Sequence, residues 1–183
     1  MGVGAVNAAV FLDRDGVLNH TRVRHGVPHP PDDISACVLL PGVRAACRLL
    51  DAAGYVLIVV TNQPDVTRGR QCREQVECIN AWIQYTLPIR QVLTCYHDDI
   101  DRCTCRKPRP GLLWQAARQW DIAMQDSTMV GDRWSDVEAG RAAGCRSMLI
   151  ERAYSGRERC QPDRVVADLL AAAQVILHGR DRT

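Results

Sequence analysis

Two aspartates separated by one residue, Asp13 and Asp15, directly follow the apolar run Ala8–Leu12. Carboxylates held this close repel each other unless a cation joins them, and Mg²⁺ prefers oxygen ligands together with substrate phosphates. Gly16 lets the chain turn sharply away after the pair. A turn with solvated acids would carry the same residues, so the motif alone leaves both interpretations open. Its spacing does not fit an EF-hand, because the twelfth position counted from Asp13 is Arg24.

Further polar residues could complete a site for phosphoryl chemistry. Asp132 could be a third magnesium ligand, and Asp136 could support it or cap the next helix. Thr61 and Asn62 offer a hydroxyl and backbone amides to a phosphate oxygen, although Thr61 could also be a turn residue at a strand end. Lys107 could place a fixed positive charge on a transferring phosphoryl group, or be a solvated surface charge.

Cysteine and histidine gather in a second cluster, which contains Cys95-x-His97 and Cys103-x-Cys105. Residues two apart in an extended chain face the same side, so each pair can bind one metal ion. Three thiolates and one imidazole favour tetrahedral Zn²⁺ with no open position, which is typical of a structural site. A Cys103–Cys105 redox pair and unrelated buried thiols are the alternatives.

Apolar strands that alternate with helices must position these residues. Strands are predicted at Val6–Leu12, Tyr55–Val60, Gln91–Cys95, Ser127–Val130 and Arg146–Ile150. Helices are predicted at Val43–Ala53, Gln71–Leu87, Gly111–Trp120, Asp136–Ala143 and Asp168–Leu177. The alternation indicates an α/β, Rossmann-like fold of three layers, a parallel sheet with helices on both faces. Because ligands bind at the carboxyl ends of parallel strands, the polar motifs that follow strands are expected at one edge.

Composition limits the classes of function. The chain has 183 residues, of which 46% are apolar, so residues 1–183 are predicted to form one domain. A net charge of +2 and 5% aromatic residues argue against a nucleic-acid binder, including a phosphatase that acts on DNA ends. No apolar run is long enough to cross a membrane. Nine cysteines without a leader peptide predict reduced thiols, and we expect a cytoplasmic protein and a monomer.

The motifs appear in a fixed order after successive predicted strands: Asp13-x-Asp15-Gly16, Thr61-Asn62, Lys107-Pro108 and Gly131-Asp132-x-x-x-Asp136. In this order they resemble the haloacid dehalogenase superfamily of phosphohydrolases, from Val6 to about Ile150. Many relatives insert a separate cap domain over the site. No segment here is long enough for one, so the resemblance implies an open site and a small substrate.

The resemblance also implies a role for each matching residue. Asp13 would be the nucleophile that forms an aspartyl-phosphate, and Asp15 would be the general acid and base. Thr61 and Lys107, together with Asn62, would bind the phosphoryl group. The magnesium ligands would be the carboxylates of Asp13 and Asp132 and the backbone carbonyl of Asp15.

The Cys/His cluster runs straight into Arg106-Lys107-Pro108, which is similar to a branch with heptose bisphosphate and histidinol-phosphate phosphatases. The short spacer Asp98–Arg102 resembles the histidinol-phosphate enzymes, and Arg133 stands where heptose enzymes often carry lysine. The resemblance to this branch implies that Arg106 contacts a substrate phosphate. It implies the same role for Arg133, whose position matches the motif of the branch less closely. We expect a Mg²⁺-dependent sugar-phosphate phosphatase of carbohydrate metabolism, most simply acting on heptose 1,7-bisphosphate. Histidinol phosphate is the alternative substrate, and a non-catalytic zinc-dependent binding module is the alternative of another class.

Two segments without clear periodicity are predicted to be functional loops. A zinc loop is expected at about residues 95–110, where the metal would hold the segment that presents the phosphate-binding cations. A specificity loop is expected at about residues 19–41. It offers Arg22, Arg24, His25 and His29 to a second phosphate or to hydroxyl groups, unless these side chains are simply solvated.

Overall fold

The computed structural model describes residues 7–180, with a six-stranded parallel sheet at the centre. Its strands are β1 (Ala9–Leu12), β4 (Val56–Asn62), β5 (Gln91–Cys95), β6 (Thr128–Gly131), β7 (Arg146–Ile150) and β8 (Arg164–Val166). The order across the sheet is β5-β4-β1-β6-β7-β8. The fully buried strand β1 therefore pairs with β4 on one side and with β6 on the other.

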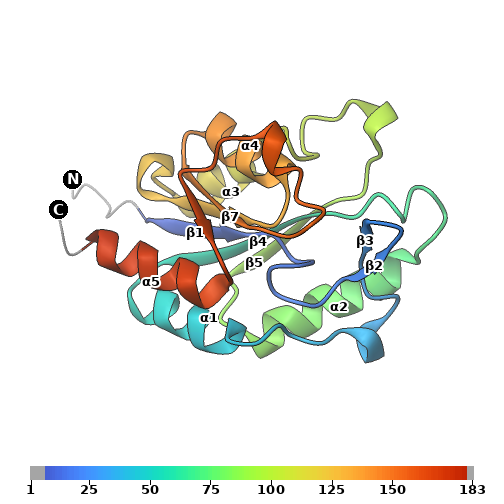
Figure 1. Cartoon of the computed structure of the whole chain (residues 1–183), viewed down its shortest axis with the longest axis horizontal. Helices are drawn as coiled ribbons and strands as arrows, with labels where there is room; N and C mark the ends of the chain where they lie inside the picture. The colour runs from blue at the N-terminus through green and yellow to red at the C-terminus, as the bar shows by residue number, and fades with distance from the viewer. Residues whose placement is uncertain (1–6, 181–183) are drawn as a thin grey trace.

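Helices cover both faces of the sheet (Figure 1). They are α1 (Val43–Ala52), α2 (Arg73–Thr86), α3 (Gly111–Trp120), α4 (Trp134–Ala143) and α5 (Leu169–Arg180). Helices α1, α2 and α5 lie on one face, and α3 and α4 lie on the other. Side chains alternate along β1, so Val10 and Leu12 join the core on the α1 side, while Ala9 and Phe11 join the core on the α3 side. The predicted three-layer α/β architecture is confirmed.

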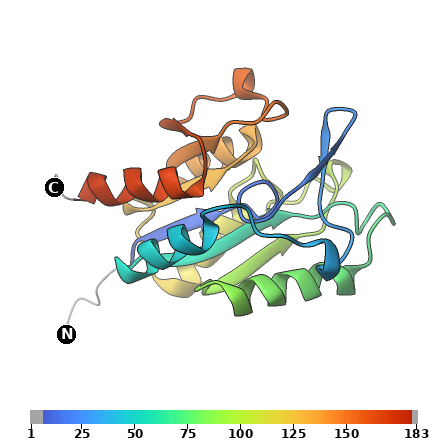
Figure 2. The ribbon, with the colours of Figure 1, turned by 60° about the horizontal axis from the view of Figure 1, so that its bottom comes forward.

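The structure contains short elements that the sequence did not predict. Strand β8 lies at the edge of the sheet, and the antiparallel hairpin of β2 (Arg22–Arg24) and β3 (Val27–His29) projects from the fold (Figure 2). These strands have three residues each, all of them exposed or half-buried, so they carry no apolar alternation. Four single-turn 3₁₀ helices within residues 7–180 cover Ile34–Ala36, Asp99–Asp101, Met124–Asp126 and Arg157–Arg159.

Most predicted elements keep their places with shifted ends. Helix α4 begins at Trp134, two residues earlier than predicted, because the side chain of Asp136 accepts a hydrogen bond from the backbone N–H of Arg133 and caps the helix start. Val6, the first residue of the first predicted strand, lies outside the described residues. None of the helices in residues 7–180 is long and apolar enough to cross a membrane.

Candidate active site

Buried charged side chains converge where β1 and β6 end. Asp13 follows β1, Asp132 follows β6, and Asp136 lies in the first turn of α4. Lys107 reaches them from the loop before α3: its Nζ lies 2.7 Å from Oδ1 of Asp13 and 2.6 Å from Oδ1 of Asp136. The ammonium group also donates a hydrogen bond to the carbonyl oxygen of Val60 at 2.7 Å. When all three carboxyl groups are ionised, this buried cluster has three negative charges and only one positive charge, so two negative charges are not balanced.

The donor set fits a divalent cation. Carboxylate oxygens of Asp13, Asp132 and Asp136 all lie within 4.8 Å of one another. Asp136 is already engaged by Lys107 and by the backbone N–H of Arg133. By contrast, Oδ1 of Asp132 is buried and has no hydrogen-bond partner among residues 7–180. An unpaired buried carboxylate oxygen is costly, and a hard cation such as Mg²⁺ would satisfy it while balancing the surplus charge.

Electrostatics within the cluster follow from the same crowding. Burial raises the pKa of Asp13 to about 6; Lys107 opposes this rise, and Asp136 and Asp15 add to it. Burial, with the charges of Asp13 and Asp136, lifts the pKa of Asp132 well above its usual range. Burial alone would lower the pKa of Lys107, but the carboxylates of Asp13 and Asp136 outweigh it and raise that pKa. A bound cation would keep the carboxylates ionised.

Asn62, at the end of β4, holds the backbone of Lys107 with two hydrogen bonds. Its Nδ2 donates to the carbonyl oxygen of Lys107 at 3.1 Å, and its Oδ1 accepts from the N–H of Lys107 at 3.1 Å. The side-chain amide of Asn62 thus positions Lys107, and the backbone N–H of Asn62, which the sequence offered to a phosphate oxygen, is not used by these two hydrogen bonds. The neighbouring Thr61 is buried at the cleft, and its hydroxyl accepts a hydrogen bond from Nε2 of Gln63 at 2.8 Å.

Asp15 lies beside the cluster and is fixed by a separate network. Its Oδ2 accepts hydrogen bonds from Nε2 of Gln63 at 2.7 Å and from the fully buried guanidinium of Arg14 at 2.9 Å. Its Oδ1 accepts from Nδ2 of Asn19 at 2.9 Å. Arg14 also donates to Oδ1 of Asn80 on α2 at 2.9 Å. The sequence analysis assigned no role to these supporting residues: Gln63 and Asn80 are brought here by the fold from distant positions, and Arg14 and Asn19 are close in sequence but show their partners only in the structure.

The cluster forms the floor of a cleft of about 550 Å³. Of the sequence-predicted residues, Asp13, Asp15, Thr61, Asn62, Arg106, Lys107, Asp132 and Arg133 line it. From the predicted specificity loop, His29 also lines the cleft. Arg22, Arg24 and His25 are instead exposed on the β2–β3 hairpin, where Arg22 forms an ion pair with Asp32.

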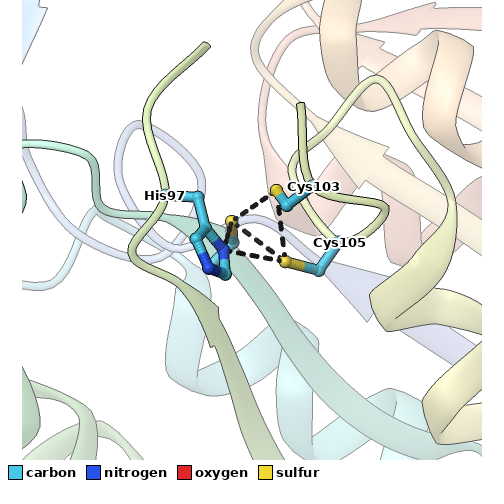
Figure 3. A group of neighbouring side chains, drawn as sticks. His97, Cys103 and Cys105 are labelled. Atoms are coloured by element: carbon cyan, nitrogen blue, oxygen red, sulfur yellow. Dashed lines mark hydrogen bonds between the residues drawn. The ribbon is translucent and has the colours of Figure 1, made fainter. Parts of the chain in front are cut away.

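The predicted Cys/His cluster is assembled beside this cleft. The labelled side chains of His97, Cys103 and Cys105 point toward one another in Figure 3. Sγ of Cys105 lies 3.3 Å from Nδ1 of His97, 3.4 Å from Sγ of Cys103 and 3.3 Å from Sγ of Cys95. None of the nine cysteines, all within residues 7–180, forms a disulfide, so the alternative redox pair is not oxidised in this structure. The group could hold one metal ion.

Comparison with known proteins places the chain among phosphatases. A family model described as HAD-hydrolase-like matches residues 104–172. The chain is 36% identical over 156 residues to D-glycero-beta-D-manno-heptose-1,7-bisphosphate 7-phosphatase from Yersinia pestis, which spans 79% of this chain and 80% of the relative. The corresponding protein of Salmonella typhi is 38% identical over the same shares. The chain belongs to this family of heptose bisphosphate phosphatases. It is therefore a phosphatase, and the resemblance predicted from its motifs is confirmed.

Solved structures of the phosphatase family share the fold. The D,D-heptose 1,7-bisphosphate phosphatase from B. bronchiseptica, complexed with magnesium and phosphate, superposes with a TM-score of 0.80 at 27% identity. The alignment covers 94% of this chain and 99% of that one. The corresponding phosphatase from Burkholderia thailandensis has a TM-score of 0.67 at 27% identity, over 93% of this chain and 99% of that one. The magnesium in the first relative supports the cation inferred here from the orphaned oxygen and the charge surplus.

Proposed function

We propose that this chain is a magnesium-dependent phosphatase that removes the 7-phosphate from D-glycero-β-D-manno-heptose 1,7-bisphosphate. The observation that carries the proposal is the convergence of Asp13, Asp132 and Lys107 at the floor of one cleft, with Nζ of Lys107 2.7 Å from Asp13. Relatives at 36–38% identity that are named for this reaction support the choice of substrate.

In the first half of the reaction, a carboxylate oxygen of Asp13 attacks phosphorus. The new bond joins Asp13 to the phosphoryl group, and the bond between phosphorus and the sugar oxygen breaks. Asp15 gives its proton to the departing oxygen. Lys107, fixed by Val60 and Asn62, holds a positive charge against the phosphoryl oxygens.

In the second half, water attacks the phosphorus of the aspartyl-phosphate, and Asp15 takes the proton of that water. Phosphate leaves, and the Asp13 carboxylate is restored. When bound, Mg²⁺ would be held by the carboxylates of Asp13 and Asp132 and by the backbone carbonyl of Asp15. Its positive charge would offset the negative charge of the phosphoryl oxygens.

The distal phosphate of the substrate would be recognised by arginines of the cleft. Nε of Arg106 donates to Oδ1 of Asp99 at 2.7 Å, which fixes the plane of the guanidinium. The NH1 group of Arg106 is buried and has no partner within the described part of the chain, so it is free to donate to a phosphate oxygen. Arg133 lines the same cleft and would add a second positive charge.

A structural zinc ion would be held by Cys95, His97, Cys103 and Cys105. Thiolate sulfurs that bind one tetrahedral zinc ion lie about 3.8 Å apart, since each Zn–S bond is about 2.3 Å long. The observed sulfur separations of 3.3–3.7 Å are close to that value without rearrangement of the loop. Because Cys105 lies two residues before Lys107, the ion would anchor the segment that presents the catalytic cation. Elemental analysis of protein purified without chelator should find about one zinc per chain; finding none refutes this site.

Phosphate release tests the function directly. The full chain is assayed with Mg²⁺ on both anomers of heptose 1,7-bisphosphate and on histidinol phosphate. We expect a higher kcat/KM for a heptose bisphosphate, and no turnover by the Asp13→Asn variant, which retains side-chain size but lacks the nucleophilic oxygen. Faster hydrolysis of histidinol phosphate would overturn the substrate, and near-normal activity of Asp13→Asn would overturn the mechanism. Absence of hydrolysis for every substrate would favour a binding module.

A further inference from the structure

Tyr154 contacts the proposed cation site but belongs to no motif found in the sequence. It follows β7, and its hydroxyl donates a hydrogen bond to Oδ2 of Asp132 at 2.7 Å. Asp132 is almost completely buried, and its other oxygen, Oδ1, is the one without a donor among residues 7–180. The two oxygens of this carboxylate are thus distinguished: one is held by the phenol, and the other is available to a cation.

The close approach depends on Gly16 in the loop after β1. Gly16 has φ +85, and a Cβ at this position would lie 1.9 Å from Oδ2 of Asp132 and 2.9 Å from Oη of Tyr154. A residue without a side chain therefore lets the loops after β1, β6 and β7 meet at one carboxylate oxygen. The hydroxyl of Thr21 lies 3.3 Å from Oη of Tyr154 and gives the phenol a second partner.

The residue after Tyr154 fastens its loop to the loop that carries Asp132. Oγ of Ser155 donates to the carbonyl oxygen of Asp132 at 2.5 Å. The N–H of Trp134 donates to the carbonyl oxygen of Ser155 at 2.7 Å. Ser155 is fully buried, so these contacts exclude water. The backbone on both sides is therefore fixed, and the Tyr154 hydroxyl has a defined place relative to Asp132.

We propose that Tyr154 is a positioning residue for the divalent cation, because its hydroxyl fixes Oδ2 of Asp132 and so directs Oδ1 toward the ion. This inference rests on the magnesium site of the proposed function. Hydrogen bonds to a ligating carboxylate hold it in the geometry that the metal requires, and their loss typically costs about 10–100-fold in metal affinity. A tyrosine that only packs would influence stability, but its hydroxyl would have no effect on metal affinity.

Metal binding by the full chain, measured without substrate, tests the inference. Protein freed of Mg²⁺ by dialysis against metal-free buffer without chelator, so that the proposed zinc site is left undisturbed, is titrated with Mn²⁺. Binding is followed by the EPR signal of the free ion, and Mg²⁺ is then added as competitor. Tyr154→Phe keeps the ring and removes only the hydroxyl. Tyr85→Phe makes the same change in α2, where Tyr85 is 92% exposed, and is the matched control. We expect Tyr154→Phe to weaken Mn²⁺ and Mg²⁺ binding at least 10-fold, and the control to bind as the wild type does.

Kinetics separate positioning from other roles. For Tyr154→Phe, the Mg²⁺ concentration at half-maximal rate should rise by the same factor, while kcat at saturating Mg²⁺ returns to nearly the wild-type value. Equal metal affinity of wild type and Tyr154→Phe overturns this inference and leaves the proposed function intact. Failure of the wild type to bind either ion overturns the magnesium site itself, and with it the proposed function.

Discussion

Replacing the proposed nucleophile should stabilise the metal-free protein. Asp13 is buried beside Asp136 and Asp15, and its pKa in the folded chain is raised to about 6 from the ordinary value of 3.8. Without a divalent cation, folding at neutral pH therefore requires an ionised carboxylate in a place that favours the neutral form. Asn is neutral and has nearly the same shape, so Asp13→Asn removes this cost. Lys107 keeps its ion pair with Asp136 in the variant.

The size and pH range of the effect follow from the two pKa values. Below pH 4, Asp13 is protonated in both the folded and the unfolded chain, and wild type and variant should be about equally stable. As the pH rises from about 4 to about 6, the unfolded chain loses the proton first, so the wild type loses stability relative to the variant. Above pH 6 the difference levels off. The difference between the pKa values corresponds to about 3 kcal/mol in the free energy of unfolding.

Urea unfolding in EDTA measures this difference. Wild type and Asp13→Asn are unfolded at pH 4, 5, 6 and 7, with tryptophan fluorescence and far-UV circular dichroism as probes. Titrating groups that do not feel the Asp13 charge contribute equally to both proteins and cancel in the difference, whereas Asp132 and Lys107, whose pKa values the Asp13 charge raises, contribute to it. Saturating Mg²⁺ should then stabilise the wild type more than the variant at pH 7. A variant that is less stable than the wild type at pH 7 in EDTA would refute the reasoning.

Three further substitutions test the residues that bind the phosphoryl group, position Lys107 and hold the proposed zinc ion. Lys107→Met keeps the length of the side chain without its charge, and should lower kcat about 10²–10³-fold in steady-state assays; a loss below tenfold contradicts its role. Asn62→Ala removes two hydrogen bonds to Lys107 and should lower the free energy of unfolding by about 1–3 kcal/mol in urea titrations, together with kcat. Cys105→Ser should abolish zinc in elemental analysis and lower the Tm; unchanged zinc content would remove Cys105 from the ligand set.

The sheet and the main site could be predicted because each depends on strong local signals. Tyr55–Val60 is continuous and apolar, as expected for a strand buried on both faces, and polar residues follow it at once. Strand β8 has two exposed residues out of three, and its pairing is determined by its neighbour β7 rather than by its own pattern. The β2–β3 hairpin was missed because its strands have only three residues each and none of those residues is buried.

The supporting residues of the site could not be predicted from sequence spacing. Tyr154 and Asp132 are 22 positions apart, and their contact depends on where the loop after β7 returns across the sheet edge. The side chain of Asn62 likewise bonds the backbone of Lys107, which is 45 positions away in the sequence, and no local pattern predicts that contact. The sequence left two roles open for Asp136, a helix cap and a group that supports the site. In the structure its side chain makes both contacts: it accepts a hydrogen bond from the N–H of Arg133 and forms an ion pair with Lys107.

The position of β1 in the sheet has a consequence for how the chain is made. β1 leaves the ribosome before both of its neighbours in the sheet, and the second of them, β6, ends only at Gly131. Until β6 is made, one edge of β1 is unpaired. Asp13 likewise lacks Asp132 until then, and its ion-pair partner Lys107 is made 94 residues after it. A nascent chain that stops before residue 131 thus contains neither the finished centre of the sheet nor the cation site. One short stretch of the chain, residues 128–136, therefore completes both the centre of the sheet and the carboxylate cluster.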